Sequence, residues 1–182
     1  MTYLLPAVQA LLGLVVILGG VFDFRQRRVP NWLTLSGVVV GIGLNSFLFE
    51  TAGLWLSLKG LGLALLIYIP LYLLRSVGGG DVKLMAAVGA IAGPANWLAI
   101  MLITSLFGGI AAIGLIAIKH RFRRTLANIW VILTSLSRGR MPFEDNPQLD
   151  VRGEQAVRLP HAVVIACATI AFLVVARTWA PK

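Results

Sequence analysis

The chain carries seven acidic residues among 182, and two of them are placed where they could work as a catalytic pair. Asp23 and Asp81 each lie at the junction of an apolar run and a basic segment. An ionisable side chain beside membrane hydrocarbon is costly, which favours a functional role and a partner. Two carboxyl groups in one site cannot both ionise cheaply, so one serves as a base while the other keeps its proton. Such a pair can activate water and protonate a leaving amine, which is the chemistry of peptide hydrolysis.

The surroundings of Asp81 are the more informative. It follows Gly78, Gly79 and Gly80 and precedes an apolar helix. The glycines permit a tight turn with positive φ and a close approach by another segment, and an aspartate at a helix start accepts hydrogen bonds from free amides. A simple helix-capping role explains Asp81 but not the glycines. The next turn signal, at residues 93–96, is about 12–15 residues away, or roughly 18–23 Å of helix. That is shorter than a membrane core of about 30 Å, so Asp81 is predicted inside the inner boundary.

Asp23, taken alone, is explained by pairing with Arg25 or Arg27 at a membrane surface. A catalytic role for Asp23 becomes the better interpretation only when Asp81 is considered with it.

The composition indicates a membrane protein. The chain is 58% hydrophobic and 13% charged, with a mean hydropathy of +0.87, which excludes an ordinary soluble domain, a disordered chain and a nucleic-acid-binding domain. The single cysteine, Cys167, excludes a disulfide scaffold, and we expect its thiol to be buried and inert. Apolar runs span residues 3–22, 32–49, 54–74, 82–118 and 160–175, and the fourth is divided at 93–96. The fold class expected is all-α: a polytopic protein with six transmembrane helices in a single membrane-embedded domain over residues 1–182.

The basic residues orient the predicted spans. All of them except Lys59, Arg177 and Lys182 fall in the segments after the first, third and fifth crossings. The positive-inside rule then places these segments in the cytoplasm and both termini outside. Tryptophans favour the headgroup layer, and we expect this location for those near predicted span ends, which are Trp32, Trp55, Trp97 and Trp179.

The polar stretch of residues 119–159 is predicted to be a cytoplasmic loop. Within it, apolar residues recur at helical spacing from Phe122 to Leu136. This pattern is typical of an amphipathic helix on the inner leaflet, or of a solvated helix packed on its own protein.

Several short motifs resemble those of the type IV prepilin peptidases, which are aspartic proteases of the GxGD membrane class. The run Gly78-Gly79-Gly80-Asp81-Val82-Lys83 resembles the family's GxGDxK motif. Asp23 with the later Val29-Pro30-Asn31 resembles the segment around the family's first aspartate. Leu159-Pro160-His161 is similar to a looser proline-aromatic motif, with histidine in the aromatic position.

The resemblance implies an endopeptidase of a bacterial or archaeal inner membrane, which removes the basic leader from prepilin or pseudopilin precursors at the cytoplasmic face. It implies that Asp23 and Asp81 are catalytic, without a cofactor or metal, and that supporting positions are Gly78, Gly79, Gly80, Lys83, Pro30 and Asn31. Lys83 either holds the loop, tunes the pair, or extends toward the membrane surface. The chain starts directly in its first span and lacks paired cysteines, which is similar to the short peptidase-only type serving Flp pili. Methyltransferase activity is therefore not predicted. Four acidic residues of the predicted polar loop could bind a basic leader peptide, or they could be solvated without that role: Glu144, Asp145, Asp150 and Glu154.

Two other classes remain as alternatives. The sequence has no HExxH or GxSxG motif, which argues against metal and serine proteases, and presenilin-like proteases have longer chains. A small transporter or scaffold subunit could use Asp23 and Asp81 to bind a cation or proton, or for ion pairing. The expected partners are the precursor substrate and membrane lipid, with no nucleic acid; the sequence does not predict an oligomeric state.

Overall fold

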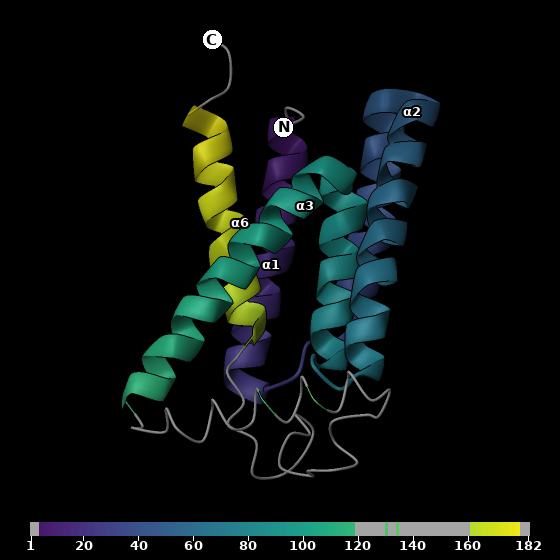
Figure 1. Ribbon diagram of the computed structural model, residues 1–182. Coiled ribbons are helices and arrows are strands. Elements are labelled where there is room, and N and C mark those ends of the chain that lie inside the picture. Colours follow the sequence, from purple (N-terminus) through teal and green to yellow (C-terminus); the bar gives the residue numbers. More distant parts are fainter. Residues whose placement is uncertain (1–3, 119–129, 131–133, 135–160, 179–182) are drawn as a thin grey trace.

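The computed structural model describes residues 4–118, 130, 134 and 161–178. The described residues form the helices α1 (Pro6–Gln26), α2 (Asn31–Leu73), α3 (Gly79–Ile118) and α6 (His161–Thr178), and contain no strand (Figure 1). The predicted all-α class is therefore confirmed for this part of the chain. Apart from Trp130 and Thr134, the predicted surface helix and the polar loop of residues 119–159 lie outside the described residues.

Helices α2 and α3 each reverse direction at a single residue. Glu50 has φ 53° and ψ −135°, and Gly93 has φ 74° and ψ 170°. Each helix therefore consists of two arms: residues 31–49 and 51–73 in α2, and 79–92 and 94–118 in α3. The arms of α2 lie side by side, whereas the second arm of α3 turns back and slopes away from the first toward α6 (Figure 1). Glycine adopts positive φ without strain, and Pro94 then opens the next arm, where its missing N–H costs nothing. The reversal predicted at residues 93–96 is confirmed and begins at Gly93.

One buried amide completes the bend in α3. Pro94 has no N–H to donate to the carbonyl of Ala90, four residues earlier. The Asn45 amide nitrogen, on the first arm of α2, donates instead to Ala90 O at 3.3 Å and to Ile91 O at 3.1 Å. It also donates to Ser57 Oγ at 2.8 Å. Asn45 thus ties both arms of α2 to the bend.

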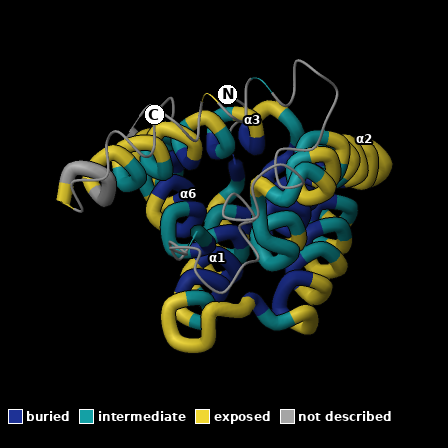
Figure 2. Tube along the Cα trace, turned by 60° about the horizontal axis from the view of Figure 1, so that its bottom comes forward, coloured by how far each residue is buried: buried dark blue, intermediate teal, exposed yellow. Residues whose placement is uncertain are grey.

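The helices meet at a buried interior and present an apolar outer surface. Figure 2 shows the buried residues facing inward and the exposed ones outward. Leu12, Leu84 and Phe172 lie in the interior, whereas Phe47 is 85% exposed. By length and composition, α1, α2 and residues 79–114 of α3 can cross a membrane, and α6 is a shorter apolar helix. An outer surface of this kind is unfavourable in water and suits contact with lipid.

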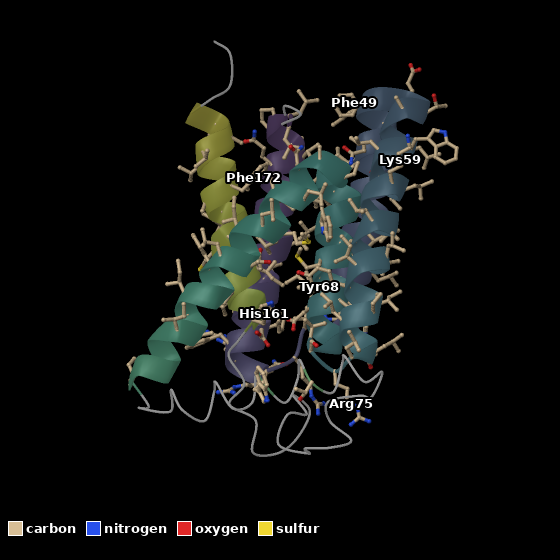
Figure 3. All side chains as sticks on the ribbon, in the orientation of Figure 1. Phe49, Lys59, Tyr68, Arg75, His161 and Phe172 are labelled. Atoms are coloured by element: carbon tan, nitrogen blue, oxygen red, sulfur yellow. The ribbon has the colours of Figure 1, made fainter. Side chains whose placement is uncertain are left out.

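The segments that carry the two aspartates lie at one end of the bundle. α1 starts and α6 finishes at the other end (Figure 1). Figure 3 shows Arg75 at the end where α1 finishes and α3 starts, and Phe49 and Lys59 at the opposite end. We call the first of these the aspartate end. The separation of Arg75 from Lys59 agrees with the charge distribution used to orient the chain.

Two expectations about single residues are wrong. Trp97 is fully buried, and its Nε1 donates to Met85 O at 3.0 Å, so this ring belongs to the core and not to a headgroup layer. The bend at Gly93 causes this, because it brings Trp97, near the start of the second arm of α3, back against Met85 in the first arm. Trp32 and Trp55 are each 61% exposed, as a surface location requires. Cys167 is exposed rather than buried, because it lies on an outward face of α6.

Candidate active site

The packing of α1 against the first arm of α3 brings Asp23 and Asp81 together. A Cβ on Gly19 would lie 3.0 Å from Leu84 Cδ1, so these positions face each other. The two segments run in opposite directions (Figure 1). Asp23 lies one helical turn after Gly19 in α1, and Asp81 lies three residues before Leu84 in α3. Because the segments run in opposite directions, Asp23 and Asp81 are therefore opposite each other. The charges of the two carboxyl groups interact, and both side chains are half-buried.

Asp23 is held by the start of α6. Its Oδ2 accepts a hydrogen bond from the Ala162 N–H at 3.1 Å, across 139 positions of sequence. Arg27 ends α1 in the left-handed conformation, and its N–H donates to Asp23 O at 2.8 Å. The charge of Arg27 also reaches the Asp23 carboxyl. Asp23 therefore interacts with Arg27, as the sequence suggests. Its carboxyl also holds the start of α6.

Asp81 is held by its own loop. Its Oδ2 accepts from the Gly78 N–H at 3.2 Å, while its own N–H donates to Gly78 O at 3.1 Å. A side chain in the first turn that reaches back to the preceding amide is half of a capping box. The prediction that Asp81 accepts a hydrogen bond from a backbone amide at the helix start is confirmed.

The three glycines before Asp81 do not adopt positive φ. Among the described glycines only Gly93 has positive φ, so that part of the expectation is wrong. A Cβ on Gly79 would lie 3.4 Å from Tyr72 Cε2, and one on Gly80 would lie 3.4 Å from Val29 Cγ2. The loop is thus pressed between the end of α2 and the segment that follows Asp23.

The two sequence motifs contact each other directly. Lys83 Nζ donates to Asn31 Oδ1 at 2.8 Å, although the lysine is exposed. Pro30 occupies the N-cap position of α2, with φ −63°, and Val29 before it is buried against Gly80. The Lys83–Asn31 hydrogen bond joins the first turn of α3 to the start of α2.

Two residues that sequence reasoning did not assign to the site lie beside it. His161, the first residue of α6, interacts electrostatically with both aspartates. Tyr68, 5% exposed on the second arm of α2, interacts with Asp81. The tyrosine ring meets Trp97 edge-on, with centroids 6.1 Å apart. The proline-aromatic motif offered a signal for His161, whereas nothing in the local sequence distinguishes Tyr68 from other aromatic residues of apolar helices.

The arrangement suits acid–base chemistry. Each carboxyl is oriented by a main-chain N–H on Oδ2, and the charges of the two groups interact. In the part of the chain that the structure describes, no group of three or more His, Cys, Asp or Glu side chains has the geometry to hold a metal ion.

Comparison with known proteins gives a family match. The profile of the type IV leader peptidase family matches residues 10–113, more than half of the chain, and the match includes both aspartates and the glycine loop. No curated protein and no solved structure matches the chain. The extent of the family match shows that this chain belongs to the type IV leader peptidase family, whose members are membrane-embedded proteases.

Proposed function

We propose that this chain is a membrane aspartic endopeptidase that removes the basic leader from prepilin or pseudopilin precursors. The observation that carries the proposal is the juxtaposition of Asp23 and Asp81 at one end of an apolar bundle.

The reaction uses the two carboxyl groups as a base and an acid. The ionised carboxylate takes a proton from water, and the resulting hydroxide attacks the peptide carbonyl carbon. When the C–N bond breaks, the protonated carboxyl gives its proton to the leaving amine, so the net change is the addition of one water. The roles of base and acid are assigned to the pair as a whole, and neither role is assigned to Asp23 or to Asp81 alone. Since the hydrogen bonds to the main chain use Oδ2, Oδ1 of each carboxyl is the atom proposed to face the substrate.

The location of the site fits the substrate. A prepilin has an apolar helix preceded by a basic leader, so its scissile bond lies at a membrane face. We propose that the arms of α2 and α3 cross individually, which gives six crossings with α1 and α6 in one peptidase domain. The basic residues then place the aspartate end at the cytoplasmic face of the inner membrane and both termini outside.

The direct test is cleavage of a synthetic prepilin by the purified protein in detergent. Asp23→Asn and Asp81→Asn should each lower kcat/KM by more than about 100-fold, because a carboxamide neither takes nor gives the proton. The fold should persist, since the carboxamide oxygen still accepts from Ala162 or Gly78. Glu50→Gln is the matched control: this carboxyl is exposed at the bend of α2, away from the site, and cleavage should be unchanged. Normal cleavage by either Asp variant would refute the pair.

A second test addresses the class of mechanism. Cleavage should continue in the presence of EDTA, since the proposed water activation uses only the two carboxyl groups. Loss of activity with EDTA, restored by a divalent cation, would contradict the proposal.

A further inference from the structure

His161 occupies a position where several elements of the site converge. It is the first residue of α6, and the next residue, Ala162, donates its N–H to Asp23 Oδ2 at 3.1 Å. On its other side, a Cβ on Gly108 would lie 3.7 Å from His161 Cε1. The imidazole, half-buried, therefore lies between the end of α1 and the second arm of α3 (Figure 3).

The packing of α6 fixes this location. A Cβ on Gly20 would lie 3.2 Å from the Ala166 Cβ and 3.6 Å from Ala162 O, so α6 runs tightly along α1. Ala162 itself has no exposed surface. The start of α6, where His161 stands, is therefore fixed against the end of α1.

Several elements contribute charged and titratable groups to the aspartate end. Asp23 and Arg27 belong to the end of α1, Asp81 to the first arm of α3, and Tyr68 to the second arm of α2. The electrostatic interactions of His161 reach both carboxyl groups. An imidazole carries a positive charge when both of its ring nitrogens are protonated.

Building on the proposed function, we propose that His161 is a positioning residue that sets the charge state of the Asp23–Asp81 pair. When protonated, it places a positive charge near the two carboxyl groups and stabilises the form with one carboxylate and one carboxylic acid relative to the fully protonated pair. This is the form that the reaction needs, because hydrolysis uses one base and one acid together. His161 acts through the pair and takes no part in proton transfer to or from the substrate.

The sign of the effect follows from electrostatics. A cation favours the ionised carboxylate, so more acid is required to protonate the pair completely and stop cleavage. Without the charge, the acidic limb of the pH–rate profile should move toward neutral pH. A permanently charged side chain at position 161 should keep that limb where it is in the native protein.

The first measurement is kcat/KM against pH for the native protein and for His161→Gln, His161→Phe and His161→Arg. The two neutral variants should move the acidic limb upward by about one pH unit, equivalent to a roughly tenfold lower rate on that limb. His161→Arg should retain the native limb. Equal loss at all pH values in every variant would indicate a structural role and overturn the proposal.

The second measurement needs no substrate, so it separates this proposal from the proposed function. Infrared spectra of the full chain in detergent record the carboxylic-acid C=O band as pH is varied, and difference spectra with Asp23→Asn and Asp81→Asn assign it. The midpoint for the pair should be higher in His161→Gln or His161→Phe than in the native protein. Identical midpoints would refute the role of His161, whether or not the protein cleaves prepilin. A shifted midpoint without cleavage would refute the proposed function and leave the role of His161 standing.

Discussion

At the scale of single residues, the hydrogen bond from Lys83 to Asn31 gives the two motifs a direct connection. It joins the first turn of α3 to the start of α2 at 2.8 Å. We expect Lys83→Met and Asn31→Ala each to lower kcat/KM about fivefold, since the bond contributes about 1 kcal/mol to holding the loop. The double variant should be no worse than either single variant. Fully additive losses in this double-mutant cycle would show that the two residues act independently.

The neighbouring residues Asn45 and Ser46 make a matched pair for a test of stability. Asn45 is 2% exposed and donates to two carbonyls at the bend of α3. Asn45→Leu should destabilise the protein by about 1–3 kcal/mol, because it leaves buried acceptors without donors. Among the described residues, Ser46 Oγ is buried with no hydrogen-bond partner, so Ser46→Ala should be neutral or slightly stabilising. Thermal unfolding in one detergent compares the two, and equal effects would contradict the role given to Asn45.

At the scale of elements, contact between glycines sets the position of the arm that carries Asp81. A Cβ on Gly60, in the second arm of α2, would overlap the carbonyl of Gly89 in the first arm of α3. Gly60→Ala should therefore push the arms apart, lower stability by about 1–3 kcal/mol and reduce cleavage. A Cβ on Gly62 meets no atom within 4 Å among the described residues, so Gly62→Ala should be tolerated. Unfolding temperature and kcat/KM report both effects, and a harmless Gly60→Ala would argue against this close approach.

The sequence predicts the elements better than it predicts their neighbours. Continuous apolar runs and the Gly93-Pro94 pair predict the helical arms and the second bend, because these are properties of local sequence. The pairing of Asp23 with Asp81 is predicted from the free-energy cost of an ionisable side chain beside membrane hydrocarbon and from the two motifs that contain these residues. The burial of Trp97, the exposure of Cys167 and the placement of His161 depend on which faces the helices turn to each other. Those faces are set by contacts between distant residues, such as Gly20 with Ala166, that no local pattern records.

At the scale of the whole molecule, the connections at residues 27–30 and 74–78 both lie at the aspartate end. This gives a test of the orientation of the protein in the membrane. In a Cys167→Ser background, Ser76→Cys and Thr51→Cys place one exposed thiol at each end of the bundle. In intact cells, a membrane-impermeant maleimide should label residue 51 but not residue 76. Inside-out vesicles should give the reverse. Labelling of both positions from the same side would contradict the six-crossing arrangement.

The hydrogen bonds that hold the two carboxyl groups have an evolutionary consequence. Asp23 fastens α6 to α1, and Asp81 closes the start of α3, so neither position becomes free to drift when selection for hydrolysis is relaxed. Degenerate copies of this gene that survive as inactive pseudoenzymes should keep an acceptor at both sites, with asparagine favoured over alanine. In such copies, the side chains at positions 23 and 81 would be retained for their structural hydrogen bonds rather than for catalysis.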